Sequence, residues 1–289
     1  MTPAASPAPT APAKGGRSAV QGTAPAGQGG RPAPGERPFH RALILLHSVL
    51  VMVWAALITP PCVLVYVALG ALNLRARPER AIEWLWGGSI AAAAGVRLKV
   101  TGRERLARGA SFVIMPNHRS WIDVPLLFRI LAHRDTRWVG KKEIVSWPFF
   151  GWAFALSRHV VIDRGNRDAA VRAIRKAAGM TGDGVSVMIF PEGTRSTGRT
   201  LLPLKKGGFH LALETGLPIL PVAVSGTERV LPKHGWTVRP GAVNVVFCEP
   251  VAPRGGAEAL LELVAEVRQR LGAALERVEG PSFPAEEVA

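Results

Sequence analysis

The sequence predicts an α/β protein in which helices flank a mixed, mostly parallel sheet, preceded by an N-terminal membrane-associated helical hairpin. Three observations support this prediction. A long apolar run lies near the N-terminus, short β-branched runs alternate with helical stretches from about residue 96, and an amphipathic pattern follows near the end. Strands that alternate with helices are typical of a layered α/β architecture. At 289 residues the chain can bury one large core.

The first segment, residues 1 to 38, consists mostly of Ala, Pro, Gly, Ser and Thr with scattered basic residues. This composition buries too little apolar surface to offset the conformational entropy that ordering would remove. We therefore expect a disordered tail over residues 1–38.

The next segment is the apolar run, which has no Asp, Glu, Lys or Arg between residues 42 and 74. It is long enough for one tilted transmembrane helix. Pro60 and Pro61 divide it, however, and prolines inside a helix remove backbone donors and tend to end it. Basic residues flank both ends, which fits both ends lying on the cytoplasmic side. We therefore favour a hairpin that enters one leaflet, within a membrane-associated region over 39–95, over a single span.

A folded domain over 96–250 follows, because the pattern changes there to short strand-like runs. The candidate strands are 96–100, 111–115, 137–140, 159–163, 185–190, 219–224 and 243–247. Helices are expected near 124–133, 167–180 and 207–215. In the last segment, 251–289, apolar residues recur at helical spacing and predict a closing helix and tail. They are Leu260, Val264, Val267, Leu271 and Leu275.

The charge and the cysteines limit the classes of partner. The formal net charge is +15, and the first 41 residues hold only five basic residues and one acidic residue. The folded body is therefore basic, which attracts nucleic acid, anionic lipid headgroups or phosphorylated substrates. No nucleic-acid-binding motif occurs, so we expect no nucleic acid as partner. The isolated Cys62 and Cys248 have neither metal-ligand spacing nor the pattern of a disulfide framework, so no metal is expected.

The stretch "PNHRSWIDV" (116–124) follows a predicted strand and carries His118 and Asp123. In α/β sheets the carboxyl ends of strands are where ligands bind. The two side chains can meet only if the chain turns between them, and Ser120-x-x-Asp123 matches a helix-opening box that predicts such a turn. A carboxylate there would hold the imidazole in one tautomer, leaving its other nitrogen to take a proton from a hydroxyl. The alternative is that Asp123 only caps a helix.

A second stretch, "FPEGTRS" (190–196), follows another predicted strand. Pro191 and Gly193 suit a tight turn, and a glycine lets backbone donors approach an anion closely. Arg195 offers a planar fork that matches phosphate oxygens. Taken alone, this stretch is equally consistent with a surface loop that carries a solvated arginine.

Together, His-x4-Asp followed by Phe-Pro-Glu-Gly-Thr-Arg-Ser resembles the glycerolipid acyltransferase family, and most closely its 1-acylglycerol-3-phosphate acyltransferases. The blocks "KKE" (141–143), "VVIDR" (160–164) and "LPILPVAVSG" (217–226) fall in the order expected for that family. The resemblance covers roughly residues 95 to 250, which makes 96–250 an acyltransferase domain. His159 departs from the pattern, because relatives often carry a small residue before the "VVIDR" block, and this bears on the choice of acceptor.

The resemblance implies roles for particular residues. His118 and Asp123 would be the catalytic pair. The other implied residues bind the phosphate-bearing acceptor: Glu192, Gly193, Thr194 and Arg195, with Lys141 or Lys142.

The resemblance also implies a function. The protein would be a membrane-bound enzyme that transfers a fatty acyl group from acyl-CoA or acyl carrier protein to the sn-2 hydroxyl of 1-acylglycerol 3-phosphate, giving phosphatidic acid. Transfer would be direct, with no cofactor. The partners would be the lipid bilayer, the lysophospholipid acceptor and the acyl donor, and the catalytic domain would face the cytoplasm. The alternative acceptor is another lyso-lipid, such as a lyso-ornithine lipid.

Overall fold

The computed structural model of this chain describes residues 38–72, 77–157, 159–163 and 165–280. The tail predicted over 1–38 lies outside the described residues, except for Pro38. The segment after 280, predicted as the end of the closing tail, also lies outside them.

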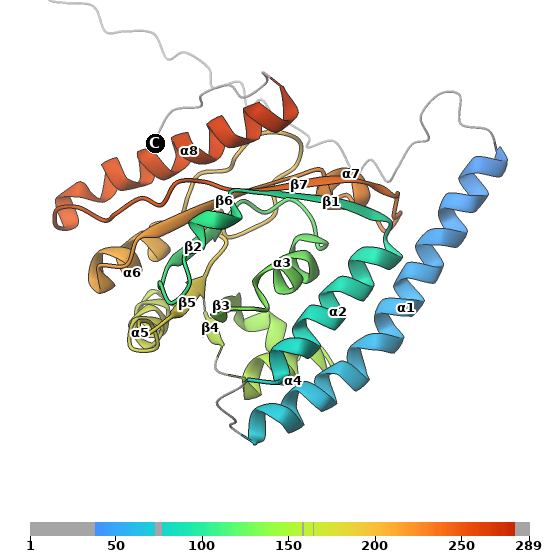
Figure 1. The fold of residues 1–289 in the computed structure, drawn as a ribbon, viewed down its shortest axis with the longest axis horizontal. Coiled ribbons are helices and arrows are strands. Elements are labelled where there is room, and N and C mark those ends of the chain that lie inside the picture. Colours follow the sequence, from blue (N-terminus) through green and yellow to red (C-terminus); the bar gives the residue numbers. More distant parts are fainter. Residues whose placement is uncertain (1–37, 73–76, 158, 164, 281–289) are drawn as a thin grey trace, which may run out of the picture.

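A seven-stranded sheet with the order β1-β7-β6-β2-β5-β3-β4 forms the centre of the molecule (Figure 1). Its strands are β1 (Val96–Thr101), β2 (Val113–Pro116), β3 (Asp135–Lys141), β4 (Val160–Ile162), β5 (Val185–Met188), β6 (Ile219–Ser225) and β7 (Gly241–Phe247). Neighbouring strands are parallel except β6 and β7, which are antiparallel. The prediction of seven strands in a mixed, mostly parallel sheet is confirmed.

Helices cover both faces of this sheet. The predicted ones are α3 (Asp123–Leu131), α5 (Arg167–Ala178), α6 (Gly207–Thr215) and α8 (Leu260–Glu279). Two short helices and three 3₁₀ turns were not predicted, because they are too short to carry a periodic pattern. They are α4 (Phe150–Leu156), α7 (Thr227–Val230), η1 (Arg103–Arg105), η2 (Lys142–Ser146) and η3 (Ala257–Ala259).

Two apolar clusters show how the layers are arranged. One joins α2 and α3 to the sheet, and the other joins α5, α6 and α8 to it. Central strands are therefore covered on both sides, and every residue of β6 is buried. All five apolar residues that predicted the closing helix are buried in α8. That prediction is confirmed.

The N-terminal region differs from the prediction in one respect. α1 (Pro38–Ala71) is one continuous helix that contains Pro60 and Pro61, so a hairpin turn at these prolines is wrong. The chain reverses after α1, and α2 (Glu79–Ala93) lies beside it (Figure 1). Packing explains the continuity. The Thr59 hydroxyl donates to the Ala55 carbonyl at 2.6 Å and accepts from the Trp86 indole of α2 at 3.0 Å. Tertiary contacts thus hold a segment that local preference would interrupt.

α1 has two different faces. On one face, both ring nitrogens of His47 contact backbone carbonyls of the body, and Val51 and Val63 are buried. On the other face, large apolar side chains such as Leu50 and Leu57 are exposed. Among the described residues, α1 is the one helix long and apolar enough to cross a membrane. Its exposed apolar surface suits an association with lipid.

Candidate active site

The topology brings the two sequence motifs together. β2 and β5 are adjacent and parallel, with Val113 opposite Val187 and Ile114 opposite Met188. Their carboxyl ends therefore lie at the same edge of the sheet, and the loops that follow them carry His118 and Arg195. His118 and Glu192, which are 74 positions apart in the sequence, are thus joined by a direct hydrogen bond.

His118 and Asp123 form a hydrogen-bonded pair. The Nδ1 atom of His118 lies 2.7 Å from Oδ2 of Asp123, whose side chain is fully buried. The same oxygen accepts the backbone N–H groups of Arg119 at 2.8 Å and Ser120 at 2.9 Å. These bonds define the turn expected at Ser120, with Asp123 as the first residue of α3. Asp123 therefore both caps the turn and orients the imidazole. The Nε2 atom of His118 takes no part in this hydrogen bond.

The loop after β5 holds the His118 backbone and ring in place. The Phe190 ring stacks on the imidazole, with centroids 3.9 Å apart. The backbone N–H of His118 donates to Oε1 of Glu192 at 2.8 Å, and its carbonyl accepts from the N–H of Ser196 at 2.8 Å. The other Glu192 oxygen accepts from the N–H of Leu202 at 3.0 Å. Glu192 is thus a buried brace between the two loops, which differs from the acceptor contact that the resemblance implies.

Burial has a cost for Glu192. It raises the pKa of this carboxyl above its usual value, and the backbone donors of His118 and Leu202 oppose that rise. These two backbone hydrogen bonds therefore offset part of the cost of burying the Glu192 side chain.

Arg195 is held by an aromatic ring. Its guanidinium lies over the Trp121 ring at 4.7 Å, and the Trp121 and Trp147 rings are 4.9 Å apart. Within the part of the chain that the structure describes, the buried Nη1 atom of Arg195 has no hydrogen-bond partner. Burial lowers the pKa of Arg195, and the Asp123 charge opposes this. Trp121 was not predicted as a site residue, although its position inside "PNHRSWIDV" was a usable signal.

Gly193 and Thr194 form the turn between the brace and the arginine. Gly193 has a φ of 70°, a conformation that favours glycine, and its N–H donates to the Phe190 carbonyl at 3.1 Å. The tight turn expected here is present. Thr194 is exposed at its tip.

The two candidate lysines lie at the end of β3, next to β5 in the sheet. Lys142 forms an ion pair with Asp163, which follows β4, at 2.8 Å. This bond raises the pKa of Lys142 and lowers that of Asp163. The exposed Lys141 forms no ion pair with any described residue, so its ammonium is more available than that of Lys142 to an external anion.

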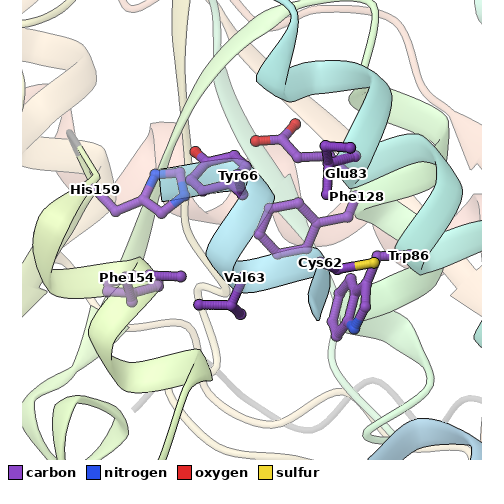
Figure 2. A pocket seen from close by; sticks show the side chains of 10 residues that line it. Cys62, Val63, Tyr66, Glu83, Trp86, Phe128, Phe154 and His159 are labelled. Atoms are coloured by element: carbon purple, nitrogen blue, oxygen red, sulfur yellow. The ribbon is translucent and has the colours of Figure 1, made fainter. Parts of the chain in front are cut away.

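A separate apolar cavity lies between α1, α2, α3 and α4 (Figure 2). None of the predicted site residues lines it, but His159 does. Nδ1 of His159 accepts the backbone N–H of Trp138 at 3.3 Å, and burial, followed by the charge of Arg137, lowers its pKa to about 3. The imidazole that departs from the family pattern is therefore neutral and packed away from the His118 loop.

Comparisons with known proteins fit this geometry. A family model described as Acyltransferase matches residues 97–225. A 1-acyl-sn-glycerol-3-phosphate acyltransferase of Cocos nucifera is 35% identical over 173 residues, 60% of this chain and 53% of the relative. An uncharacterized acyltransferase of Schizosaccharomyces pombe is 32% identical over 187 residues, 63% of this chain and 67% of the relative. The crystal structure of the 1-acyl-sn-glycerophosphate acyltransferase from Thermotoga maritima has a TM-score of 0.71 at 27% identity, covering 84% of this chain and 98% of that one.

The fold is a mixed α/β sheet with a hydrogen-bonded histidine and carboxylate at the carboxyl edge of its strands, next to a loop that carries an arginine. With these similarities, the chain belongs to the acyltransferase family. It spans little more than half the length of the Cocos nucifera relative.

Proposed function

We propose that this protein transfers a fatty acyl group from a thioester, acyl-CoA or acyl carrier protein, to the sn-2 hydroxyl of 1-acylglycerol 3-phosphate, giving phosphatidic acid. The observation that carries the proposal is the His118–Asp123 bond of 2.7 Å at the sheet edge, with Arg195 held in the adjoining loop. The names of the relatives from Cocos nucifera and Thermotoga maritima, both 1-acylglycerol-3-phosphate acyltransferases, support the same reaction.

The chemistry needs one base. With Nδ1 donating to the Asp123 carboxylate, the lone pair of His118 Nε2 takes the proton of the acceptor hydroxyl as its oxygen attacks the thioester carbonyl carbon. Asp123 stabilises the imidazolium that forms. When the tetrahedral intermediate collapses, the carbon–sulfur bond breaks and the thiolate receives the same proton. An ester and a free thiol result, and no acyl-enzyme is needed.

Arg195 supplies the anion-binding part of the site. Arg195 is partly exposed and its guanidinium lies over the Trp121 ring, so the planar donors of its accessible edge would bind an acceptor phosphate. Lys141 is the candidate second cation at the same sheet edge. Holding the phosphate fixes the distance between the hydroxyl and His118, and this positioning accounts for much of the rate gain. We assign no cofactor and no metal to the reaction.

Access to a lipid acceptor is the role we propose for α1. Its exposed apolar face would place the domain at the bilayer surface, where both the acceptor and its product reside. The basic body, part of a chain with net charge +15, would favour anionic headgroups. We place the catalytic domain on the cytoplasmic face, because basic residues flank both ends of the apolar segment.

The decisive experiment uses purified protein, labelled acyl-CoA or acyl carrier protein, and a panel of lyso-lipids. We expect product with 1-acylglycerol 3-phosphate, and a loss of about 10²- to 10⁴-fold in kcat for His118→Ala. His210→Ala, an exposed histidine on α6, is the matched control and should keep its activity. Unchanged turnover in His118→Ala would refute the base. Higher kcat/KM with a lyso-ornithine lipid would instead identify that alternative acceptor.

A further inference from the structure

The residue that follows the proposed base is a buried arginine. Arg119 is 1% exposed and is among the largest fully buried side chains of the described chain. Its charge faces Glu279, the last residue of α8, whose side chain is also 1% exposed. These two residues are 160 positions apart, and Glu279 lies beyond the 97–225 segment that the family model matches.

The contacts of Arg119 join three separate segments. Its Nη1 atom donates to Oε1 of Glu279, and its Nη2 atom donates to the carbonyl of Arg199 at 2.9 Å. Arg199 belongs to the loop that continues from the "FPEGTRS" motif. Its own guanidinium contacts both the carbonyl and the carboxylate of Glu279. Glu228 of α7 adds a weaker ionic contact to Arg119 at 3.9 Å.

The backbone of Arg119 is part of the proposed catalytic turn. Its N–H donates to the Asp123 oxygen that also holds His118 Nδ1. The Arg119 charge also acts on Glu192, the brace beneath His118. A displacement of the Arg119 side chain would therefore shift the Arg119 backbone N–H that donates to Asp123. Because the same Asp123 oxygen holds His118, the imidazole would turn as well.

Stability alone does not account for this ion pair. Removing two charges from water costs about as much as their attraction returns, so a buried pair is weak support for stability. What the arginine fork does provide is geometry, because its planar donors fix two acceptors in one plane. Here the two acceptors belong to the end of α8 and to the loop after the anion-binding turn.

We propose that Arg119 and Glu279 are positioning residues, and that the last turn of α8 completes the active site by locking the His118 turn against the loop of Arg199. The inference rests on the proposed function, because it assigns the pair an effect on acyl transfer by His118. A planar donor group on Arg119 is required, so a lysine there would not replace it.

The test compares Glu279→Gln with Glu276→Gln, an exposed acid one turn earlier on the same helix. We expect kcat of Glu279→Gln to fall about tenfold to a hundredfold, the loss typical of a small displacement of reacting groups. The KM values for the thioester and for the acceptor should both stay within about threefold of the wild type. A cooperative thermal melting transition should show that the variant is folded. Arg119→Lys should lose kcat similarly, whereas Glu276→Gln should match the wild type.

A second variant keeps the inference testable if the single change unfolds the protein. The double change Arg119→Met with Glu279→Leu removes both charges and should fold, yet kcat should remain reduced. Wild-type kcat in this double variant, or equal kcat in Glu279→Gln and Glu276→Gln, would overturn the inference. Absence of transfer by the wild-type protein would instead count against the proposed function.

Discussion

At the scale of single residues, the guanidinium of Arg195 lies over an aromatic ring and forms no ion pair with a carboxylate of the described residues. Trp121 provides that ring at 4.7 Å. A carboxylate partner would compete with the acceptor phosphate for the same donors, whereas a ring holds the cation and leaves the donors at its edge available. Trp121 therefore belongs to the acceptor site that we propose, although it contributes no polar atom to it.

This arrangement predicts different effects on the two substrates. Arg195→Ala should raise the KM for the phosphorylated acceptor about tenfold or more, the loss expected for a hydrogen bond to a charged group. Trp121→Ala should raise it about two- to fivefold, the value of an exposed cation–π contact, and Trp121→Phe should restore most of it. Steady-state kinetics should show the KM for the thioester unchanged. An equal rise in both KM values would contradict a phosphate role.

The residues of the site were predictable to different degrees. His118, Asp123 and Arg195 stand in short motifs, so residue type and spacing were enough to select them. Glu192 stands in the same motif, but its bracing role depends on the backbone donors of His118 and Leu202, one of which is 74 positions away. A local sequence pattern does not contain contacts between residues so far apart along the chain.

At the scale of helices and strands, the contact between α1 and α2 contains an acid with a strongly raised pKa. Glu83 of α2 lies beside Tyr66 of α1, whose hydroxyl donates a hydrogen bond to it (Figure 2). Burial raises the pKa of Glu83 to about 8, and the charges of Glu79 and Asp135 add to the rise. The Tyr66 bond and the charge of Arg80 oppose it. The folded protein therefore keeps a proton on Glu83 at neutral pH.

The sign of the resulting pH dependence follows from linkage. An unfolded chain releases this proton near its ordinary pKa of 4.5 and the folded chain near 8, so stability falls as pH rises between these values. We expect the melting temperature of the wild type in detergent to fall from pH 5 to pH 8. Glu83→Gln should fall less, whereas the exposed control Glu276→Gln should follow the wild type. Parallel curves for all three proteins would contradict this assignment.

The same helix pair shows where sequence patterns fail. The strands were found because β-branched runs and their flanking turns are local signals. The break expected at Pro60 and Pro61 was wrong because the bond between Trp86 and Thr59 depends on α2, 27 residues along the chain. Local proline rules describe an isolated helix, whereas α1 packs against α2 over part of its length.

At the scale of the whole molecule, α1 is tied to the catalytic domain on one face. His47 contacts the Ala93 and Val238 carbonyls near one end, and Cys62 and Val63 line the cavity against α4 further along. A helix of 34 residues is about 50 Å long, and the hydrocarbon core of a bilayer is about 30 Å thick. If α1 crossed the bilayer, the polar domain packed along it would have to enter the hydrocarbon. An orientation along the membrane surface avoids this cost.

This geometry predicts that the start of α1 lies on the same side of the membrane as the catalytic domain. His40→Cys, near the start of α1, and His210→Cys on α6 place exposed thiols at the two positions, while the native Cys62 and Cys248 are buried. In sealed vesicles, a membrane-impermeant maleimide should label both introduced cysteines from the same side, with the unmodified protein as the background. Labelling of the two positions from opposite sides would show that α1 spans the bilayer, and the surface orientation would be wrong.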